Sequence, residues 1–358
     1  MDENLDFVKV AKIKVIGVGG GGNNAVNRMV TDGVKGVDFY VANTDAQVLK
    51  GITGVNKIFL GKDITQGLGA GGNPEIGRKA AQESENEIRE ALADANMVFV
   101  AAGMGGGTGT GGAPVVAKIA RDLGALTVGV VTSPFTFEGP RRKRQAFAGL
   151  EELRKNVDSI IVVSNDRLLE VIGNRPMNEA FREADNILRQ SVQTITDLIA
   201  IPAMINLDFA DVSSVMKDRG DALIGIGMAE GENKAQEAAK RAVSSPLLDV
   251  SINGAKDAIV NITGGPSMSL FEASEAFATI TEAIGNDVNA IMGVASNDQL
   301  DDQIIVTIIA TGFEEDQPEE EAVVTPKQTY TVRGNKTTTV VEDDDEDPLP
   351  GFIRNRKI

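Results

Sequence analysis

The sequence predicts an α/β fold in which a long central helix joins a parallel-sheet domain to a second, mixed α/β domain. Three features predict it. Apolar strands alternate with helices in the first half of the chain, a pattern typical of parallel sheets covered on both faces. A long amphipathic segment follows, and beyond residue 210 further strand candidates have fewer helices among them. We therefore expect the first domain over residues 1–176, the helix over 177–201 and the second domain over 202–313.

The strand candidates are short apolar runs bounded by helix or turn residues. In the first domain they cover residues 12–18, 36–43, 56–61, 95–103, 125–132 and 158–164. In the second domain they cover residues 221–229, 257–264, 289–295 and 303–310. Helices are expected from the end of the first strand to Val30, over 75–93 and over 113–123.

The segment 177–201 has one apolar stripe at the three-to-four-residue spacing of a buried helix face. Pro176 stands at the expected first turn and Pro202 just past the end, both common positions for proline. A helix of this length would span roughly 37 Å. The stripe consists of Ala180, Phe181, Ala184, Ile187, Leu188, Val192, Ile195, Leu198 and Ile199.

The last 45 residues differ in composition from the rest of the chain, with 12 acidic and 6 basic residues. Acidic blocks without apolar periodicity do not repay the entropy of ordering, so residues 314–342 are expected to form a disordered linker. Residues 343–358 differ in their last ten residues, which place apolar side chains beside basic ones. They form either a disordered end or a short amphipathic peptide that orders on a partner.

Composition excludes several kinds of chemistry. The chain contains no Cys and no His, which removes disulfides, thiolate or imidazole metal ligands, cysteine nucleophiles and Ser-His triads. The net charge of −17 disfavours nonspecific binding to nucleic acid or to an anionic membrane. No segment approaches the roughly 20 apolar residues of a membrane span, and the first ten residues lack the order of a signal peptide. We expect a cytoplasmic protein without direct membrane insertion.

Three glycine-rich segments follow strand candidates of the first domain. GVGGGGNNAVNRM satisfies GxGxxG over residues 17–22 and joins a strand to a helix, the context that phosphate binding requires. In this Rossmann-like arrangement, four backbone amides would face an anion at the positive end of the helix. These are the amides of Gly20, Gly21, Gly22 and Asn23.

The other two segments are GMGGGTGTGG (103–112) and GLGAGGNP (67–74). A tight turn needs only one or two glycines, so this density favours backbone that closely surrounds a ligand. The carboxyl ends of parallel strands are where open α/β sheets bind ligands, and three such loops indicate that several phosphates are held. The chain lacks GxxxxGK[ST], which excludes a P-loop enzyme. A dinucleotide-dependent oxidoreductase remains an alternative because Asp38 and Asp45 lie near the expected ribose acid, although that motif has no use for the second loop.

NLDFADV (206–212) presents Asp208 and Asp211 at i and i+3. If a helix begins at Phe209, both carboxylates lie near its first turn. For an isolated DxxD, helix capping is the more common role. The position indicates another role, because a pair at the far end of the long helix cannot reach phosphates roughly 37 Å away. It could reach those of a neighbour stacked head to tail.

Together these segments resemble the FtsZ branch of the tubulin/FtsZ family, which acts in bacterial cell division. The resemblance covers residues 10–313 and the C-terminal end. The segments that carry it are GVGGGGNNAVNRM, NTDAQ, GLGAGGNP, AGMGGGTGTGG, TSPFTFEG, NDRLLE, FREADNILRQ, INLDFADV and DPLPGFIRNR.

The resemblance implies GTP as the nucleotide, Mg²⁺ beside its phosphates, and hydrolysis to GDP. The phosphate-binding residues that it implies are Gly20, Gly21, Gly22, Asn23, Asn24, Gly107, Thr108 and Gly109, with Ala70, Gly71 and Gly72 facing the γ-phosphate. Glu138 and Arg142 would contact the ribose side, with Arg141 as the alternative to Arg142. The residues implied around the guanine are Asn165, Phe181 and Asp185. A carboxylate suits guanine, which presents two adjacent N–H donors that adenine lacks.

The resemblance also implies head-to-tail filaments that form a ring at mid-cell. Asn206, Asp208 and Asp211 would enter the pocket of the next subunit, where the acids polarise the attacking water. Membrane-tethering and regulatory division proteins such as FtsA, SepF or ZipA would dock on the terminal peptide. The docking residues implied are Leu349, Phe352, Ile353, Arg354 and Arg356. A nucleotide-binding scaffold that assembles without hydrolysis is a second alternative, and the acid pair argues against it.

Overall fold

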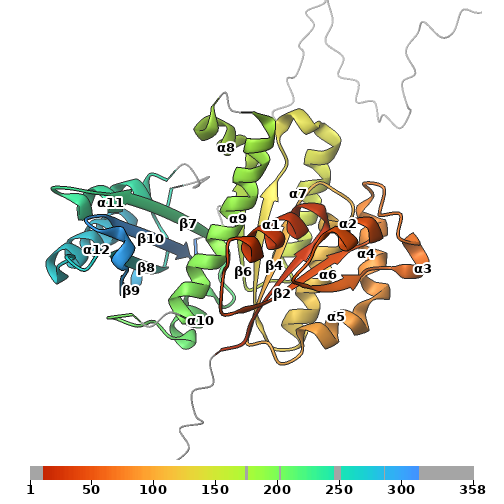
Figure 1. Ribbon diagram of the computed structural model, residues 1–358, viewed down its shortest axis with the longest axis horizontal. Helices are drawn as coiled ribbons and strands as arrows, with labels where there is room; N and C mark the ends of the chain where they lie inside the picture. Colours follow the sequence, from red (N-terminus) through yellow and green to blue (C-terminus); the bar gives the residue numbers. More distant parts are fainter. Residues whose placement is uncertain (1–10, 174–175, 201–202, 246–250, 286, 314–358) are drawn as a thin grey trace, which may run out of the picture. The chain divides into compact units, whose positions relative to one another are not determined.

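The computed structural model describes residues 11–173, 176–200, 203–245, 251–285 and 287–313 (Figure 1). In these residues the strands form one sheet in the order β3-β2-β1-β4-β5-β6-β7-β10-β8-β9. Pro202, the expected linker (314–342) and the expected docking peptide (343–358) lie outside the described residues.

All the predicted strands are present, and their ends differ from prediction by at most two residues. The strands are β1 (Ile13–Val18), β2 (Val37–Asn43), β3 (Asn56–Phe59), β4 (Met97–Gly103), β5 (Leu126–Ser133), β6 (Ser159–Ser164), β7 (Gly220–Ala229), β8 (Asp257–Gly264), β9 (Asn289–Ser296) and β10 (Ile304–Thr311).

The helices alternate with strands in the first half and become fewer in the second, as predicted. They are α1 (Gly19–Thr31), α2 (Ala46–Gly51), α3 (Lys62–Thr65), α4 (Pro74–Glu83), α5 (Glu85–Leu92), α6 (Thr108–Asp122), α7 (Pro140–Arg154), α8 (Asn165–Ile172), α9 (Met177–Ala200), α10 (Phe209–Met216), α11 (Lys234–Val243) and α12 (Leu270–Ile284), with the 3₁₀ turns η1 (Thr136–Glu138) and η2 (Asp298–Leu300).

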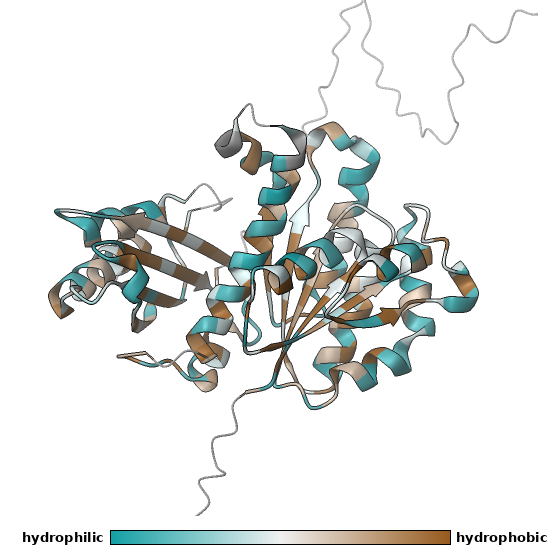
Figure 2. Cartoon of the chain, in the orientation of Figure 1, coloured by the Kyte–Doolittle hydropathy of each residue, from teal (hydrophilic) through white to brown (hydrophobic). Residues whose placement is uncertain are grey.

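The first six strands are all parallel, and β1 pairs with both β2 and β4. Their order, 3-2-1-4-5-6, is that of doubly wound nucleotide-binding sheets, in which the chain direction across the sheet reverses between β1 and β4. Helices cover both faces, so β1, β4 and β5 are buried along almost their whole length, whereas β2 and β3 also carry exposed polar residues (Figure 2). The helices α1 and α9 pack on one face, and α4, α5, α6 and α7 pack on the other.

The second half is mixed, as predicted. β10 is antiparallel to both β7 and β8, and β9 is parallel to β8. One face of these strands packs on α11 and α12, while the other contributes to the core formed with α9 and α10. The helix α9 therefore lies between the two halves of the sheet (Figure 1).

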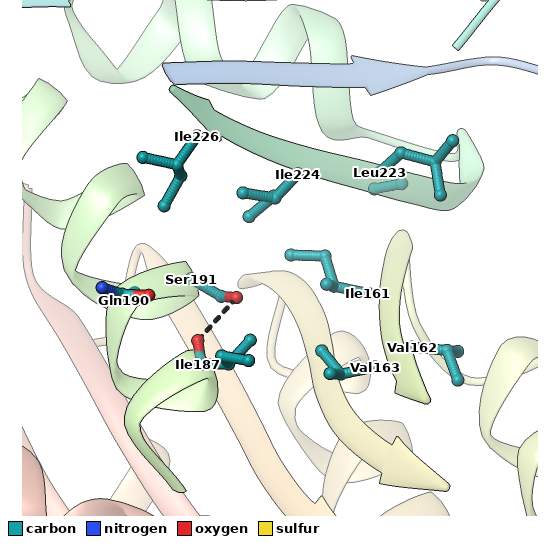
Figure 3. A pocket seen from close by; sticks show the side chains of 10 residues that line it. Ile161, Val162, Val163, Ile187, Gln190, Ser191, Leu223, Ile224 and Ile226 are labelled. Atoms are coloured by element: carbon teal, nitrogen blue, oxygen red, sulfur yellow. Dashed lines mark hydrogen bonds between the residues drawn. The ribbon is translucent and has the colours of Figure 1, made fainter. Parts of the chain in front are cut away.

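Two strands diverge where these halves join. β6 and β7 pair only through Ser159 with Gly220 and Ile160 with Asp221. Beyond these pairs a cavity of about 10 Å³ lies between β6, β7 and α9 (Figure 3). This volume accommodates about one water molecule. The hydroxyl of Ser191 in its wall already donates a hydrogen bond to the carbonyl of Ile187, at 2.9 Å, so the cavity is a consequence of strand divergence.

Two predicted helices differ from the structure. The helix expected over 75–93 is interrupted at Ser84, whose Oγ accepts a hydrogen bond from the Gly61 amide at 3.0 Å and donates one to the Phe59 carbonyl at 3.3 Å. The helix expected from residue 113 begins at Thr108. Its glycine-rich first turns are helical because Gly111 lies against the backbone of Pro74 and Arg78 at the start of α4.

Candidate functional site

The three glycine-rich loops meet at the carboxyl edge of the parallel sheet. β1 leads into α1 through Val18 and Gly19, and β4 leads into α6 through residues 104–107. A Cβ on Gly19 would lie 2.6 Å from the backbone nitrogen of Gly109, and a Cβ on Gly107 would lie 2.8 Å from the Cβ of Ala70. The first loop therefore contacts the second, and the second contacts the third.

The glycines of these loops fall into two groups. In the first group a side chain would collide with protein backbone, and it includes Gly17, Gly22, Gly109 and Gly111. In the second group no protein atom lies within 4 Å of the Cβ position, and it includes Gly20, Gly71, Gly72 and Gly106. Glycine density alone predicted backbone around a ligand. Packing of the protein on itself explains the first group, so the second group marks the space that a ligand can occupy.

Two helix N-termini lie side by side at this edge. Neither α1 nor α6 has a side-chain cap, a feature that they share with α3, α5, α7, α8 and α11. An uncapped N-terminus leaves its first amide groups free and carries a partial positive charge. Two such ends beside open space therefore fit a bound group with more than one phosphate.

Asparagine and threonine side chains hold these loops in place. The side chain of Asn23 is fully buried, donates to the Gly17 carbonyl at 2.9 Å and accepts from Asn43 at 2.6 Å. The hydroxyl groups of Thr44 and Thr108 lie 2.7 Å apart. The side chain of Asn23 is therefore part of the scaffold, which leaves its backbone amide as the group available to an anion.

A second part of the edge lies after β5 and β6. Phe135 stacks on Phe137 with ring centroids 5.0 Å apart and meets Phe181 edge to face at 5.2 Å. Asn165 begins α8, is 6% exposed, and has a buried Oδ1 without a hydrogen-bond partner among the described residues. Buried polar atoms are rarely left unpaired. The exposed aromatic rings and the unpaired amide oxygen together fit a planar base with hydrogen-bonding edges.

Asp185 faces this part of the edge from α9. Burial raises the pKa of its carboxyl group to about 6, and the positive charge of Arg28 on α1 opposes that rise. The Nε of Arg28 is buried without a hydrogen-bond partner among the described residues. A partly desolvated carboxylate is costly unless a ligand satisfies it, and two adjacent N–H donors would do so.

Glu138 and Arg142 form an ion pair at 2.6 Å. The Glu138 carboxylate is mostly buried and also accepts a hydrogen bond from the Phe135 amide at 3.0 Å. Arg142 is half exposed and packs its side chain near Gly105 of the second glycine loop. Of the two arginines considered from the sequence, Arg142 is therefore the one tied to Glu138.

Asn206, Asp208 and Asp211 are not brought to the glycine loops. Asp208 caps α10, and the two aspartates form a reciprocal capping box in which each carboxylate accepts from the other's backbone amide at 2.9 Å. The capping interpretation of this motif is confirmed. Each aspartate still has a carboxylate oxygen outside these two bonds, and Asn206 and Asp208 are exposed.

The helix α9 separates the two sets of residues. Near its start, Phe181 meets Phe135, which follows the carboxyl end of β5. Near its end, the Cβ of Ala200 lies close to Gly36, which precedes the amino end of β2. The segment 203–208 then leads into α10, so the acid pair lies beyond the opposite end of this helix.

Several residues of the site were not predicted individually. Arg28, Thr44 and the stacked Phe135 and Phe137 all lie at the edge described above. Thr44 and both phenylalanines fall within the segments NTDAQ and TSPFTFEG, so the motifs marked their place. Arg28 falls within GVGGGGNNAVNRM, but its relation to Asp185 could not be predicted, because it depends on how α1 packs against α9.

In the described part of the chain, no cluster of three or more acidic side chains could hold a metal ion. Magnesium commonly binds through substrate phosphates and water with only one or two carboxylates, so the uncapped helix ends and open glycines fit a metal–nucleotide complex. Among the same residues, no helix is both long and apolar enough to cross a membrane.

The fold defines an α/β protein whose doubly wound sheet is of the nucleotide-binding class. Residues 12–173 match the GTPase domain model of the tubulin/FtsZ family, and residues 220–314 match the C-terminal domain model of the FtsZ family. An empty FtsZ dimer from M. jannaschii is 45% identical, with 84% of this chain and 88% of that chain covered and a TM-score of 0.80. A point mutant of the M. jannaschii FtsZ is 44% identical, with coverage of 85% and 91% and a TM-score of 0.80.

A GTPγS-bound protofilament of CetZ2 from Haloferax volcanii shares the fold at 23% identity, covering 86% of this chain and 94% of that chain with a TM-score of 0.71. The chain belongs to the FtsZ family. It is thus a GTP-binding, FtsZ-like cytoskeletal protein with a tubulin/FtsZ GTPase domain, and its family membership supports self-assembly into filaments.

Proposed function

We propose that the chain binds GTP at the glycine-loop edge, assembles head to tail, and hydrolyses GTP to GDP and phosphate only at the junctions between subunits. One observation carries this proposal: the glycine loops and the acid pair lie at opposite ends of α9. The 24 residues of α9 correspond to a length of about 36 Å. A carboxylate so distant cannot act on phosphates bound to its own chain, whereas a neighbour in a head-to-tail stack can supply one.

The phosphates would be held by backbone amides at the ends of α1 and α6. In this arrangement Gly20, Gly21, Gly22, Asn23 and Asn24 bind from the first loop, and Gly107, Thr108 and Gly109 bind from the second. Ala70, Gly71 and Gly72 face the γ-phosphate. Mg²⁺ would be bound mainly by the phosphates and water, where its charge stabilises the negative charge that develops during hydrolysis.

The ribose and base would lie across the second part of the edge. Glu138 and Arg142 contact the ribose side, Phe181 packs on the base, and Asn165 and Asp185 bind its polar edge. The ionised carboxylate of Asp185 accepts from both N1–H and the exocyclic amine of guanine. Adenine offers no such pair of donors, so Asp185 selects GTP over ATP.

Hydrolysis would be completed by Asn206, Asp208 and Asp211 of the next subunit. The capping box fixes both carboxylates on the rigid first turn of α10, each with one oxygen directed to the other's amide. The remaining oxygens orient and polarise the water that attacks the γ-phosphorus. With no His in the chain, carboxylates are the bases available for this step.

The filaments are proposed to form the division ring at mid-cell in the cytoplasm. The terminal peptide, through Leu349, Phe352, Ile353, Arg354 and Arg356, would dock membrane-tethering and regulatory proteins resembling FtsA, SepF or ZipA. This part of the proposal rests on family membership, because the peptide lies outside the described residues.

The decisive measurement is phosphate release as a function of protein concentration at saturating GTP and Mg²⁺. A site shared between subunits gives a specific activity near zero below a threshold, rising together with pelleted polymer. A site complete within one chain gives the same specific activity at every concentration, and that result would refute the proposal.

A further inference from the structure

Two exposed surfaces of opposite charge lie beside the residues discussed above. The basic surface consists of Phe137 in η1 and of Arg141, Lys143, Arg144 and Phe147 in the first half of α7. The acidic surface consists of Glu230, Glu232, Leu270, Phe271, Asp298, Asp301 and Asp302, in three loops of the second half. Each surface combines large exposed apolar side chains with charges of one sign, a combination typical of protein contacts.

The basic surface is locally unfavourable. Four consecutive cationic side chains, residues 141–144, stand in the first turn of α7, where the helix dipole is positive and disfavours them. Among the described residues only Arg142 of these four forms an ion pair, with Glu138. Phe137 and Phe147 are 59% and 67% exposed beside them. Within the described part of the chain, Arg141, Lys143 and Arg144 have no ion pair, so the arrangement favours an external anionic partner.

The acidic surface is a single connected structure. Lys234 is buried and reaches Asp302 at 2.5 Å and Glu272 at 3.3 Å, which joins the starts of α11 and α12 to the β9–β10 connection. Gln303 also donates to Glu230 at 3.1 Å. The residues 230–234, 265–272 and 297–303 contain six acidic side chains and this one lysine. Leu270 and Phe271 are 73% and 76% exposed at its side.

Each of the two surfaces adjoins one of the two proposed half-sites. The basic surface follows β5 at the carboxyl edge of the first sheet, beside the proposed nucleotide pocket. The acidic surface follows the carboxyl ends of β7, β8 and β9. Backbone hydrogen bonds between Ile205 and Val294, both 3.1 Å, bring the segment before the acid pair to the same end of β9.

We infer that these surfaces are the charged rims of the contact between consecutive copies of this chain, with the basic surface of one copy facing the acidic surface of the next. The inference rests on the proposed head-to-tail assembly and names the residues that steer it. Opposite charges at two ends of one molecule favour association in a single orientation, since like ends repel. The exposed aromatic and aliphatic side chains then bury apolar area at the same contact.

The experiment uses two charge-reversal variants of the full chain, Lys143→Glu/Arg144→Glu and Glu232→Lys/Asp298→Lys. The first is expected to keep α7 folded, because acidic residues suit a helix N-terminus. Polymer is pelleted with GTP and Mg²⁺ across protein concentrations in low and high salt. At low salt each variant should need about fivefold more protein to assemble, the effect expected of a few exposed ion pairs, and high salt should reduce the difference.

An equimolar mixture tests the pairing directly. One variant carries acidic groups on both surfaces and the other carries basic groups on both, so the two should co-assemble in alternation near the wild-type threshold. Lys79→Glu/Lys118→Glu, an equal charge change on the flank of α4 and α6, should assemble normally. Failure of the mixture to recover would overturn the inference. So would loss of GTP binding in Lys143→Glu/Arg144→Glu, because the basic surface would then serve the nucleotide. If the wild-type chain itself formed no polymer, the proposed function would be the part that failed.

Discussion

At the scale of single residues, Asp211 combines a structural bond with a proposed chemical role. One oxygen accepts from the Asp208 amide at 2.9 Å, and the other is available to the attacking water. Replacing Asp211 with Asn keeps an acceptor for that amide and removes the negative charge. We expect Asp211→Asn to bind GTP and pellet as polymer while phosphate release falls about a hundredfold, within the range of general-base contributions.

Asp211→Ala separates the two roles of this side chain. It should lose turnover to the same extent and in addition lose about 1 kcal/mol of stability, because the capping bond is also removed. Thermal unfolding of the two variants measures that difference. Normal phosphate release by polymer of either variant would show that Asp211 takes no part in hydrolysis.

Asp185 predicts a pH dependence of nucleotide binding. Burial raises the pKa of its carboxyl group to about 6, so the nucleotide-free protein carries a mostly neutral carboxyl at pH 5 and a mostly ionised one at pH 7. Since only the ionised form accepts both guanine donors, affinity for GDP should rise roughly tenfold over this interval. The measurement is a binding titration at each pH, with Asp185→Asn as the reference that subtracts titration of the phosphates.

The stability of the nucleotide-free chain should change in the opposite sense. A carboxyl whose pKa is raised on folding favours the folded state while it is protonated, and that contribution is lost as pH rises from about 4 to about 6. Asp185→Asn should therefore raise the unfolding temperature at pH 7.5 and leave it nearly unchanged at pH 4. A lower unfolding temperature of Asp185→Asn at pH 7.5 would mean that the ionised carboxylate of Asp185 does not destabilise the folded chain.

Residue identities in the site were predictable only where a motif carried them. Asp208 and Asp211 were found from their spacing, and their capping bonds were one of the two interpretations. The buried hydrogen bond of Asn23 with Asn43 and the partly buried one of Thr44 with Thr108 join residues 20 and 64 positions apart. Their pairing depends on the neighbouring positions of strands in the sheet, which local sequence does not encode.

At the scale of elements, we expect substitutions of two glycines at the start of α1 to have different effects. Gly20 has open space at its Cβ position, whereas a side chain on Gly22 would collide with the Ala101 carbonyl of β4. Gly20→Ala should therefore keep or slightly raise stability, as alanine does within a helix, and weaken GTP binding at least tenfold by filling the phosphate space. Gly22→Ala should lower stability by about 1–3 kcal/mol, the usual cost of overpacking.

Thermal unfolding with and without GTP measures both effects. The two variants distinguish a glycine needed for binding from one needed for folding. Gly20→Ala should reduce the stabilisation that GTP provides, whereas Gly22→Ala should lower stability even without GTP. Should Gly20→Ala bind GTP as tightly as the wild-type chain, the first loop would not surround the phosphates.

The elements themselves were largely predictable because most strands are apolar runs and the long helix α9 has a clear apolar stripe. The errors occurred where a tertiary contact decided the local structure. Ser84 interrupts a helix because it bonds to Gly61 and Phe59. The first turns of α6 are helical because α4 packs against Gly111, so a segment that read as loop is the start of a helix.

At the scale of the whole molecule, the proposed function makes assembly a condition for catalysis, because α9 separates the glycine loops from the acid pair. Each chain then has two half-sites, the pocket and the acid pair, and each can be inactivated without the other. A chain that lacks either function should be inactive alone, and its remaining half-site should be usable by a neighbour. Complementation between two inactive chains is therefore a property of a shared site that no self-contained enzyme has.

Asp211→Ala keeps the pocket, and Gly20→Ala keeps the acid pair. In polymer formed at random from equal amounts of the two chains, about one quarter of all head-to-tail junctions would place an intact pocket against intact acids. At a GTP concentration that fills the wild-type pocket and leaves the Gly20→Ala pocket mostly empty, phosphate release should therefore recover to about one quarter of the wild-type rate, although each variant alone stays near zero. Co-sedimentation of both chains verifies that they share polymer, and mixing Asp211→Ala with Asp211→Asn provides a pair that cannot complement. If both chains pelleted together and phosphate release stayed at zero, the half-sites would not be shared across the junction.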